Sequence, residues 1–401
     1  MEHFELMKTL KVSGEGRIVL LLLDGLGGLP REQGGETELE AAHTPNLDAL
    51  ANDGVCGLHD PIAPGVTPGS GPSHLAVFGY DPLRYVIGRG VLESVGVDFP
   101  LGKEDVAARG NFCTLDEQGH ITDRRAGRIA TELNRDLCAM LRAIKLPGVE
   151  VFVETVKEHR FILVLRGKGL SGELSETDPQ RLGVSPLPVE ALAPEAKATA
   201  GLVNEFIQQA GAVLRDQHPA NMMLLRGFAM WPEIPSMQEV FGLNPASIAV
   251  YPMYRGVARL VGMAPLETGP SISDEFDALV KHFKEHDFFY LHVKKTDSAG
   301  EDGDFDRKVA LIEETDAQIP KLMALDPDVV IVTGDHSTPA LLKAHSWHPV
   351  PVLIRSRHCG VDGAVRFSER ACASGALGRF PAVDIMPMAL ANALRLGKYG
   401  A

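Results

Sequence analysis

The feature that most constrains the fold is a set of short apolar runs, each followed within a few residues by an aspartate. Every position in these runs is apolar or aromatic apart from one histidine, and several are β-branched; the runs are residues 18–23, 288–293 and 329–332. A short run without polar alternation is typical of a strand buried on both faces, as in a parallel sheet covered by helices. The chain is therefore expected to contain such a sheet.

Helical patterns lie between these runs. Thr44 followed by proline predicts a helix over residues 46–51, because threonine is a good N-cap and proline suits the first helical position. Asp304 is expected to cap a longer helix whose apolar positions recur near the helical period; they are Phe305, Val309, Ile312, Ile319 and Leu322. Strands that alternate with helices predict an α/β fold with a mostly parallel sheet flanked by helices.

The middle of the chain differs. Residues 169–200 are rich in Pro, Ser, Glu and Ala, and an amphipathic helix is expected over residues 202–214. Since the strand-ending acids lie near the N-terminus and beyond residue 285, we expect a second domain inserted between them. The predicted division is a discontinuous core domain, 1–105 and 235–401, and a smaller inserted α+β cap domain, 106–234, that binds substrate.

Composition narrows the function classes. The 401 residues are 45% hydrophobic and 23% charged, which is typical of globular proteins, and 53 acidic against 39 basic side chains give a net charge of −14. An acidic total argues against nucleic-acid or anionic-membrane partners. The five cysteines form no Cys-x-x-Cys pair, and the run at 18–23 is far shorter than the roughly 20 residues of a membrane span. A soluble cytoplasmic protein is expected.

The acids at the strand ends predict a metal site. Asp24, Asp297, Asp335 and His336 follow strands whose carboxyl ends meet at one edge of a parallel sheet. Carboxylates brought together resist ionisation unless a cation neutralises them. Oxygen ligands mixed with imidazole suit Mn²⁺ or Zn²⁺, whereas oxygen ligands alone favour Mg²⁺.

Two further segments carry candidate groups. Residues 67–74 are dense in glycine and proline, which predicts an irregular loop that can approach a ligand closely, with either Ser70 or Ser73 as a nucleophile. Either His345 or His348, shortly before the apolar segment 349–354, could complete a metal site.

Taken together, a series of motifs resembles the archaeal-type cofactor-independent phosphoglycerate mutases of the alkaline phosphatase superfamily. The resemblance runs from about residue 17 to the C-terminus, and the series is far more specific than any one motif. Its members are Leu23–Gly25, Thr44–Leu47, Pro68–Leu75, Phe78–Pro82, Gly88–Gly90, Tyr251–Gly256, Lys294–Asp297 and Thr333–Ser337.

The resemblance implies an alkaline-phosphatase-like core and an isomerase of glycolysis and gluconeogenesis. It would interconvert 3-phosphoglycerate and 2-phosphoglycerate, without 2,3-bisphosphoglycerate, through a phosphoserine and two divalent metal ions. Mn²⁺ is the usual ion, with Zn²⁺, Mg²⁺ or Co²⁺ as alternatives. Ser70 would be the nucleophile and a ligand of one ion. The implied ligands are Asp24, Asp335 and His336 for the ion that activates Ser70, and Asp297, the residue at position 301 and His345 for the other.

The chain departs from this pattern at Glu301, where the family usually has histidine. Glu301 is predicted to bind the metal through oxygen, which would make the site harder and less zinc-like. The alternative is that Glu301, Asp302 and Asp304 are acidic residues favourable near a helix N-terminus.

A substrate with a carboxylate and a phosphate requires cationic partners. The favoured cluster is Arg124, Arg125 and Arg128 on the inserted domain, with Arg255 and Lys295 as further candidates; less favoured are Arg160, Arg226, Arg259 and Lys294. Asp123 is a candidate proton shuttle, because a carboxylate must serve the glycerate hydroxyls.

Three other functions remain open at this stage. A homoserine kinase is possible on the same scaffold, since some relatives of the family look like such kinases. A metal-dependent phosphatase or a phosphopentomutase-like enzyme would use the same serine and metals. A non-catalytic phosphate-binding protein would result if Glu301 had disabled one metal site. The oligomeric state cannot be predicted from the residues.

Overall fold

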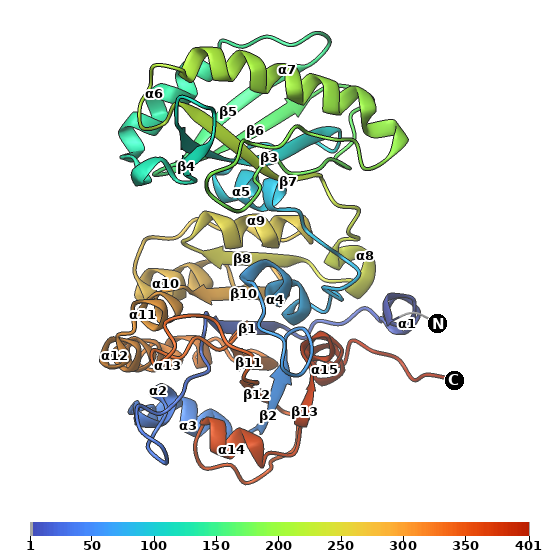
Figure 1. The fold of residues 1–401 in the computed structure, drawn as a ribbon. Helices are drawn as coiled ribbons and strands as arrows, with labels where there is room; N and C mark the ends of the chain where they lie inside the picture. The colour runs from blue at the N-terminus through green and yellow to red at the C-terminus, as the bar shows by residue number, and fades with distance from the viewer. Residues whose placement is uncertain (1–2, 401) are drawn as a thin grey trace. The chain divides into compact units, whose positions relative to one another are not determined.

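The computed structural model describes residues 3–400, which form two compact units (Figure 1). The first unit comprises the chain up to Val86 and from Ile234 onward, and the second comprises Ile87–Glu233. The sequence-based boundaries lay after residues 105 and 234, so the first boundary falls earlier than predicted. The reason is helix α5 (Arg89–Gly96), which packs on strands β3 and β7 of the second unit. Gly90 lies so close to β3 that a Cβ there would be 2.1 Å from the Ala107 carbonyl oxygen.

The first unit is built on a sheet of eight strands within the described residues, in the order β13-β2-β12-β11-β1-β10-β8-β9. The predicted strands β1, β10 and β11 are confirmed, and β1 pairs in parallel with both others. Only β12 runs antiparallel to its neighbours, β11 and β2. The strands are β1 (Ile18–Leu23), β2 (Val55–Asp60), β8 (Pro245–Ala249), β9 (Ala264–Pro265), β10 (Phe288–Val293), β11 (Val329–Thr333), β12 (Val350–Ser356) and β13 (Gly378–Pro381).

Both faces of this sheet are covered, which explains the apolar runs. On β10, Phe289, Leu291 and Val293 join the main hydrophobic core with side chains from the helices on that face. The alternate residues Tyr290 and His292 point to the other face, where their rings meet those of buried aromatic and histidine side chains. A strand in this position needs no polar alternation.

The helices of the first unit lie on either side of the sheet (Figure 1). They are α1 (His3–Leu10), α2 (Glu38–Ala41), α3 (Pro45–Asn52), α4 (Ser70–Val77), α8 (Met237–Phe241), α9 (Pro252–Leu260), α10 (Ile272–His282), α11 (Lys295–Asp302), α12 (Phe305–Asp316), α13 (Ile319–Met323), α14 (Glu369–Ala373) and α15 (Ile385–Asn392), with a 3₁₀ turn at Ala382–Asp384. The helix predicted at residues 46–51 is confirmed as α3.

The helix predicted after Asp304 is confirmed at its start and wrong at its end. Asp304 caps α12 by accepting a hydrogen bond from the Arg307 N–H at 3.0 Å. The chain then begins a separate helix, α13, with Pro320 in its first turn. Proline has no N–H to continue the hydrogen bonds of the helix and clashes with the carbonyl one turn before it, which explains the break. The apolar spacing continues across the break and therefore did not reveal it.

The second unit is an antiparallel sheet with helices on both faces. Its strands are β3 (Asp105–Leu115), β4 (Ile121–Asp123), β5 (Glu150–Lys157), β6 (Arg160–Arg166) and β7 (Met222–Met230). Helices α6 (Thr131–Leu141) and α7 (Lys197–Leu214) cover one face, α5 lies against the other, and 3₁₀ turns occupy Ala126–Arg128 and Pro194–Ala196 (Figure 1). The helix predicted at residues 202–214 is confirmed within α7, which begins five residues earlier.

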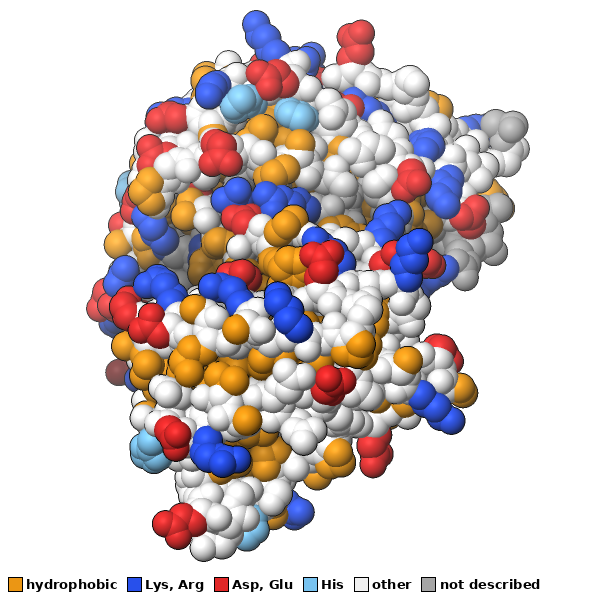
Figure 2. All heavy atoms as spheres, turned by 90° about the horizontal axis from the view of Figure 1, so that it is seen from above, with side chains coloured by type: hydrophobic (Ala, Val, Ile, Leu, Met, Phe, Trp, Pro, Cys, Tyr) orange, Lys and Arg blue, Asp and Glu red, His pale blue; other side chains and the backbone are white. Residues whose placement is uncertain are grey.

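Surface charges on the face drawn in Figure 2 are mixed. Lys and Arg side chains and Asp and Glu side chains are both spread over this face. None of the helices within residues 3–400 is both long enough and apolar enough to cross a bilayer.

Candidate functional site

The strand ends of the first unit bring one predicted ligand group together. Asp24 follows β1, Asp335 follows β11, and both carboxylates are completely buried. The Nε2 atom of His336 lies 3.4 Å from Asp24 Oδ1 and 3.1 Å from Asp335 Oδ2. One potential ligand atom from each residue lies within 4.8 Å of the others. Asp24 is more than 300 residues from the adjacent pair Asp335 and His336, and the parallel pairing of β1 with β11 brings them together.

Both carboxylates carry negative charge in this site. Burial and the nearby Asp335 oppose ionisation of Asp24, yet His292 and Lys294 hold the pKa of Asp24 below its ordinary value. Burial likewise opposes ionisation of Asp335, but His336 and His74 hold its pKa well below the ordinary range. Two buried, ionised carboxylates side by side form a strong site for a cation.

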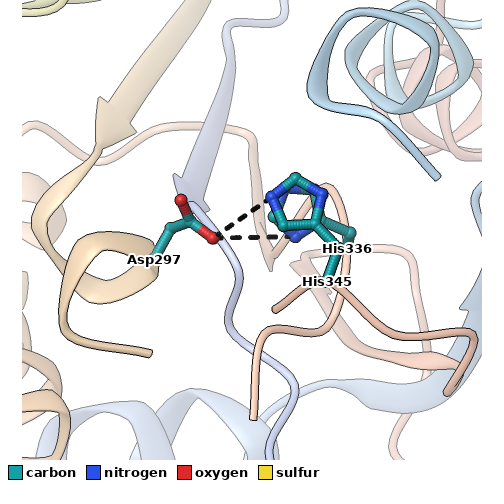
Figure 3. A group of neighbouring side chains, drawn as sticks. All are labelled: Asp297, His336 and His345. Atoms are coloured by element: carbon teal, nitrogen blue, oxygen red, sulfur yellow. Dashed lines mark ion pairs between the residues drawn. The ribbon is translucent and has the colours of Figure 1, made fainter. Parts of the chain in front are cut away.

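A second group, Asp297, His336 and His345, shares His336 with the first and is drawn in Figure 3. Asp297, in the first turn of α11, places its Oδ1 3.7 Å from His345 Nε2 and 4.0 Å from His336 Nδ1. The rings of His336 and His345 are stacked with centroids 3.6 Å apart. His345 Nδ1 donates to the Pro68 carbonyl at 3.0 Å, and since a carbonyl only accepts, the lone pair of His345 is on Nε2, toward Asp297.

Glu301 lies on the same helix as Asp297, one turn later. Residues four apart share a helix face, and the Glu301 carboxylate is 3.9 Å from His345 Nε2. Burial and the adjacent Asp297 raise the pKa of Glu301, although its side chain is about half exposed. The structure therefore brings Glu301 to the group that contains Asp297 and His345, as a carboxylate at the rim.

The residues present fit divalent metal ions. Asp24 Oδ1 and His336 Nε2 are buried atoms that have no hydrogen-bond partner among the described residues, although they point toward each other. Unpaired buried polar atoms are costly, and metal ligation would satisfy both. The combination of carboxylate oxygen and imidazole nitrogen is suited to Mn²⁺ or Zn²⁺.

Ser70 is the first residue of α4, so the predicted irregular loop ends there and the prediction that it extends to His74 is wrong. Pro72 is tolerated because the N–H groups of a first helical turn need no partner within the helix. Ser73 Oγ lies 3.0 Å from the Ser70 carbonyl oxygen and 2.9 Å from Asp335 Oδ2. His74 Nδ1 lies 2.8 Å from the same carbonyl oxygen and 3.1 Å from Asp335 Oδ2.

The two candidate serines have different surroundings. The Ser73 side chain is completely buried against Asp335, whereas Ser70 is half-buried at the helix N-terminus. Backbone N–H groups at a helix N-terminus favour an anion there. A phosphate group can therefore reach Ser70 more easily than Ser73.

Among the cationic candidates of this unit, the structure brings Lys294 rather than Lys295 to the acids. Lys294 Nζ lies 3.3 Å from Asp24 Oδ2 and forms a hydrogen bond with Asp297, while Lys295 is exposed on α11. Arg255 is half-buried on α9, 3.6 Å from Glu267. The apolar run before Lys294 predicted the end of a strand, but it could not predict which of the two adjacent lysines points toward Asp24 and Asp297.

Several predicted residues lie in the second unit. Asp123 accepts hydrogen bonds from the Arg125 and Gly127 N–H groups, both at 2.7 Å. Arg124 makes a two-pronged ion pair with the buried Asp178, at 2.9 and 2.6 Å, so its guanidinium is already engaged. Arg125 and Arg128 are exposed.

Another arginine group lies on the sheet of this unit. Arg109 on β3 is the register partner of Arg226 on β7, and Arg160 begins β6. Burial, together with the positive charges of Arg160 and Arg226, lowers the pKa of Arg109, and the buried Nε atoms of Arg109 and Arg160 have no hydrogen-bond partner among the described residues. Sequence reasoning did not single out Arg109; its signal was the one charged residue in the mostly apolar segment 106–113.

Comparisons with known proteins agree on one family. A family model described as 2,3-bisphosphoglycerate-independent phosphoglycerate mutase matches residues 51–221. A relative from Thermus thermophilus is 50% identical over 100% of both chains, and one from Aquifex aeolicus is 50% identical over 96% of this chain and 97% of its own; both are named as probable mutases of this kind.

Two solved structures are similar to this chain over nearly its whole length. A protein from Pyrococcus horikoshii has a TM-score of 0.82 at 30% identity, covering 97% of this chain and 100% of its own. The cofactor-independent phosphoglycerate mutase from Thermoplasma acidophilum has a TM-score of 0.77 at 30% identity, covering 94% of this chain and 100% of its own.

Proposed function

This chain belongs to the 2,3-bisphosphoglycerate-independent phosphoglycerate mutase family, and we propose that it interconverts 3-phosphoglycerate and 2-phosphoglycerate through a phosphorylated Ser70. The observation that carries the proposal is the convergence of two acidic and histidine ligand groups next to the N-terminus of α4, where Ser70 lies. Relatives that match the full length of the chain support the same activity.

We infer that two divalent ions belong to this site, with Mn²⁺ the favoured metal. Asp24, Asp335 and His336 would hold one together with Ser70, and the second would be held by Asp297, Glu301 and His345. When bound, such ions supply positive charge that offsets phosphate charge and lowers the pKa of a neighbouring hydroxyl.

The chemistry of Ser70 balances in two transfers. Ser70 Oγ attacks the phosphorus of 3-phosphoglycerate, the bond between phosphorus and the glycerate oxygen breaks, and the serine proton is passed to that oxygen. The 2-hydroxyl of the retained glycerate then attacks the phosphoserine, and its proton returns to Ser70. Each transfer inverts phosphorus, so the overall result is retention.

The chain offers cationic groups for the two anionic ends of the substrate. Lys294 lies among the acids of the first unit. Within the second unit, Arg109, Arg160 and Arg226 form a group in which Arg109 already pairs with Glu93 at 3.2 Å and Arg226 with Glu176 at 3.1 Å, so a substrate anion would add to these pairs. Arg125, Arg128, Arg255 and Lys295 stay candidates from the sequence. Asp123 stays the candidate proton carrier, since one N–H to each oxygen leaves further acceptor capacity on its carboxylate.

One assay tests the activity. Purified protein with Mn²⁺ is given 3-phosphoglycerate, enolase reports the 2-phosphoglycerate formed, and no bisphosphoglycerate is added. We expect turnover that a chelator abolishes and Mn²⁺ restores. Release of free phosphate instead would indicate a phosphatase, and activity that requires ATP and homoserine would indicate a kinase.

Paired serine variants test the nucleophile. Ser70→Ala should abolish turnover, because it removes the hydroxyl at the N-terminus of α4 and the other serine of this helix, Ser73, is completely buried. Ser73→Ala removes a contact to Asp335 and should reduce turnover without abolishing it. Appreciable mutase activity in Ser70→Ala would exclude Ser70 as the nucleophile.

A further inference from the structure

The hydroxyl of Thr338 lies between the two ligand groups. Thr338 is completely buried, and its Oγ1 donates a hydrogen bond to Asp297 Oδ1 at 2.6 Å. The same oxygen is 2.9 Å from His336 Nδ1. Asp297 belongs to one predicted metal site and His336 to the other, so a single hydroxyl contacts a ligand of each.

The direction of these two hydrogen bonds can be derived. An ionised carboxylate only accepts, so the one hydroxyl proton of Thr338 is committed to Asp297. The Thr338 oxygen must then accept from His336, which places the imidazole proton on Nδ1. The lone pair of His336 is therefore on Nε2, the buried atom without a partner that faces Asp24 and Asp335.

This geometry decides between two possible assignments of His336. Its Nδ1 lies 4.0 Å from Asp297, so His336 could in principle ligate in either group. With Nδ1 occupied by Thr338, only Nε2 can bind a metal, on the side of Asp24 and Asp335.

Thr338 itself is held on several sides. Its N–H lies 3.0 Å from the Gly27 carbonyl oxygen, and its own carbonyl accepts from the Lys308 ammonium at 2.9 Å. Gly300 packs so closely that a Cβ there would be 2.3 Å from the Thr338 carbonyl oxygen, and a Cβ at Gly25 would be 2.6 Å from the Thr338 hydroxyl oxygen. The hydroxyl therefore has little freedom to adopt another orientation.

We propose that Thr338 is a positioning residue that links the two metal sites, by fixing the tautomer of His336 and the orientation of Asp297 with one hydroxyl. This inference rests on the proposed function, because it assigns a role toward the metals of that function. Partners behind metal ligands commonly change metal affinity by about 10–100-fold when they are removed. Loss of the hydroxyl should weaken both sites, since both ligands lose their partner.

The test compares variants by metal binding rather than by activity. Mn²⁺ is titrated into metal-free protein by calorimetry, with free Mn²⁺ counted by electron paramagnetic resonance. The wild type should bind two ions. Thr338→Val, which keeps the shape and removes the hydroxyl, should bind Mn²⁺ about 10–100-fold more weakly, and Thr338→Ser should restore affinity close to wild type.

A matched control separates the metal effect from the loss of any buried hydroxyl. Thr315 on α12 is also completely buried and donates to the Leu311 carbonyl in its own helix at 2.9 Å. Thr315→Val should leave Mn²⁺ affinity unchanged. If Thr338→Val folds poorly, Thr338→Ala against Thr338→Ser gives the same comparison.

Two outcomes are distinguishable. Wild-type affinity for two ions in Thr338→Val, or in Thr338→Ala, would overturn the role of Thr338 and leave the proposed function standing. A wild type that binds no Mn²⁺ while it still converts 3-phosphoglycerate would instead overturn the metal sites of the proposed function.

Discussion

Glu301 is the predicted ligand at whose position the resemblance led us to expect histidine. Its carboxylate lies 3.9 Å from His345 Nε2, at the rim of the group that also contains Asp297. The sequence shows Glu301 four residues after Asp297 but did not predict helix α11, which puts both on one helix face, so two interpretations of the glutamate stayed open. The distance from Glu301 to His345 favours the interpretation of Glu301 as a metal ligand over that of an acidic residue near a helix N-terminus.

Replacing Glu301 tests that reading. Glu301→Gln should weaken binding of one Mn²⁺ by at least about tenfold and leave the other site nearly unchanged, while Glu301→His should shift the preference from Mn²⁺ toward Zn²⁺. Asp302→Asn, at the exposed neighbouring position on α11, is the control. Equal Mn²⁺ affinities in Glu301→Gln and Asp302→Asn would mean that Glu301 is not a ligand.

His159 gives the second unit a pH-dependent stability. Burial, with the positive charge of Arg160, lowers the pKa of His159 to about 4. The unfolded chain binds a proton near pH 6.5 and the folded chain does not, so stability is complete above pH 6.5 and is lost as the pH falls toward 4. The contribution is about 3 kcal/mol.

The measurement is the free energy of unfolding between pH 7 and pH 4. The wild type should lose stability over that range more steeply than His159→Gln, whose side chain does not titrate. His120, a half-exposed histidine of the same unit, supplies the control His120→Gln, which should retain the wild-type slope. Identical slopes in wild type and His159→Gln would refute the linkage.

At the scale of elements, the loops after β1 and β11 are joined by one buried cation. Lys308 on α12 is completely buried, and its ammonium donates to the carbonyls of Gly25, Gly27 and Thr338 at 2.9, 3.1 and 2.9 Å. Gly25 and Gly27 follow Asp24, and Thr338 follows His336. Lys308 therefore fixes the two loops that present the first ligand group.

Removing this cation should destabilise the first unit. Lys308→Met takes a donor away from three buried carbonyls, of which those of Gly25 and Gly27 keep only the Thr338 N–H within the described residues, so the expected cost is about 3 kcal/mol. Lys321→Met, which breaks the exposed pair with Asp277, should cost at most about 1 kcal/mol. Urea unfolding followed by circular dichroism measures both, and a Lys308→Met loss no larger than that of Lys321→Met would contradict the account.

The elements were predictable where burial leaves a simple pattern. β1, β10 and β11 are buried on both faces and appear in the sequence as apolar runs, so a parallel sheet containing them could be predicted, whereas their order in that sheet could not. The start of α4 at Ser70 could not be predicted, because glycine and proline, which follow as Gly71 and Pro72, are typical of loops. The break before α13 and the assignment of α5 to the second unit depend on local backbone geometry and tertiary packing, which apolar periodicity does not report.

For the whole molecule, the sequence predicted which acids and histidines gather at one edge of the sheet, but not the residues that contact them. Asp24, Asp335 and His336 could be predicted because strand ends of a parallel sheet meet at one edge. Thr338, His74 and Arg109 were missed, because each acts through a contact with residues distant in the chain. The net charge of −14 does not represent the charge of this site. Four acids lie there beside a lysine and two histidines; they are Asp24, Asp297, Glu301 and Asp335, beside Lys294, His336 and His345.

The central claim is that Ser70 carries the phosphoryl group during turnover. Wild-type protein with Mn²⁺ is mixed with 3-phosphoglycerate, quenched in acid within one turnover, digested, and the peptides are measured by mass spectrometry. The account predicts one added phosphoryl group on Ser70, formed at least as fast as 2-phosphoglycerate appears and absent from Ser70→Ala. Turnover without phosphorylated Ser70, or with the phosphoryl group on Ser73, would contradict it.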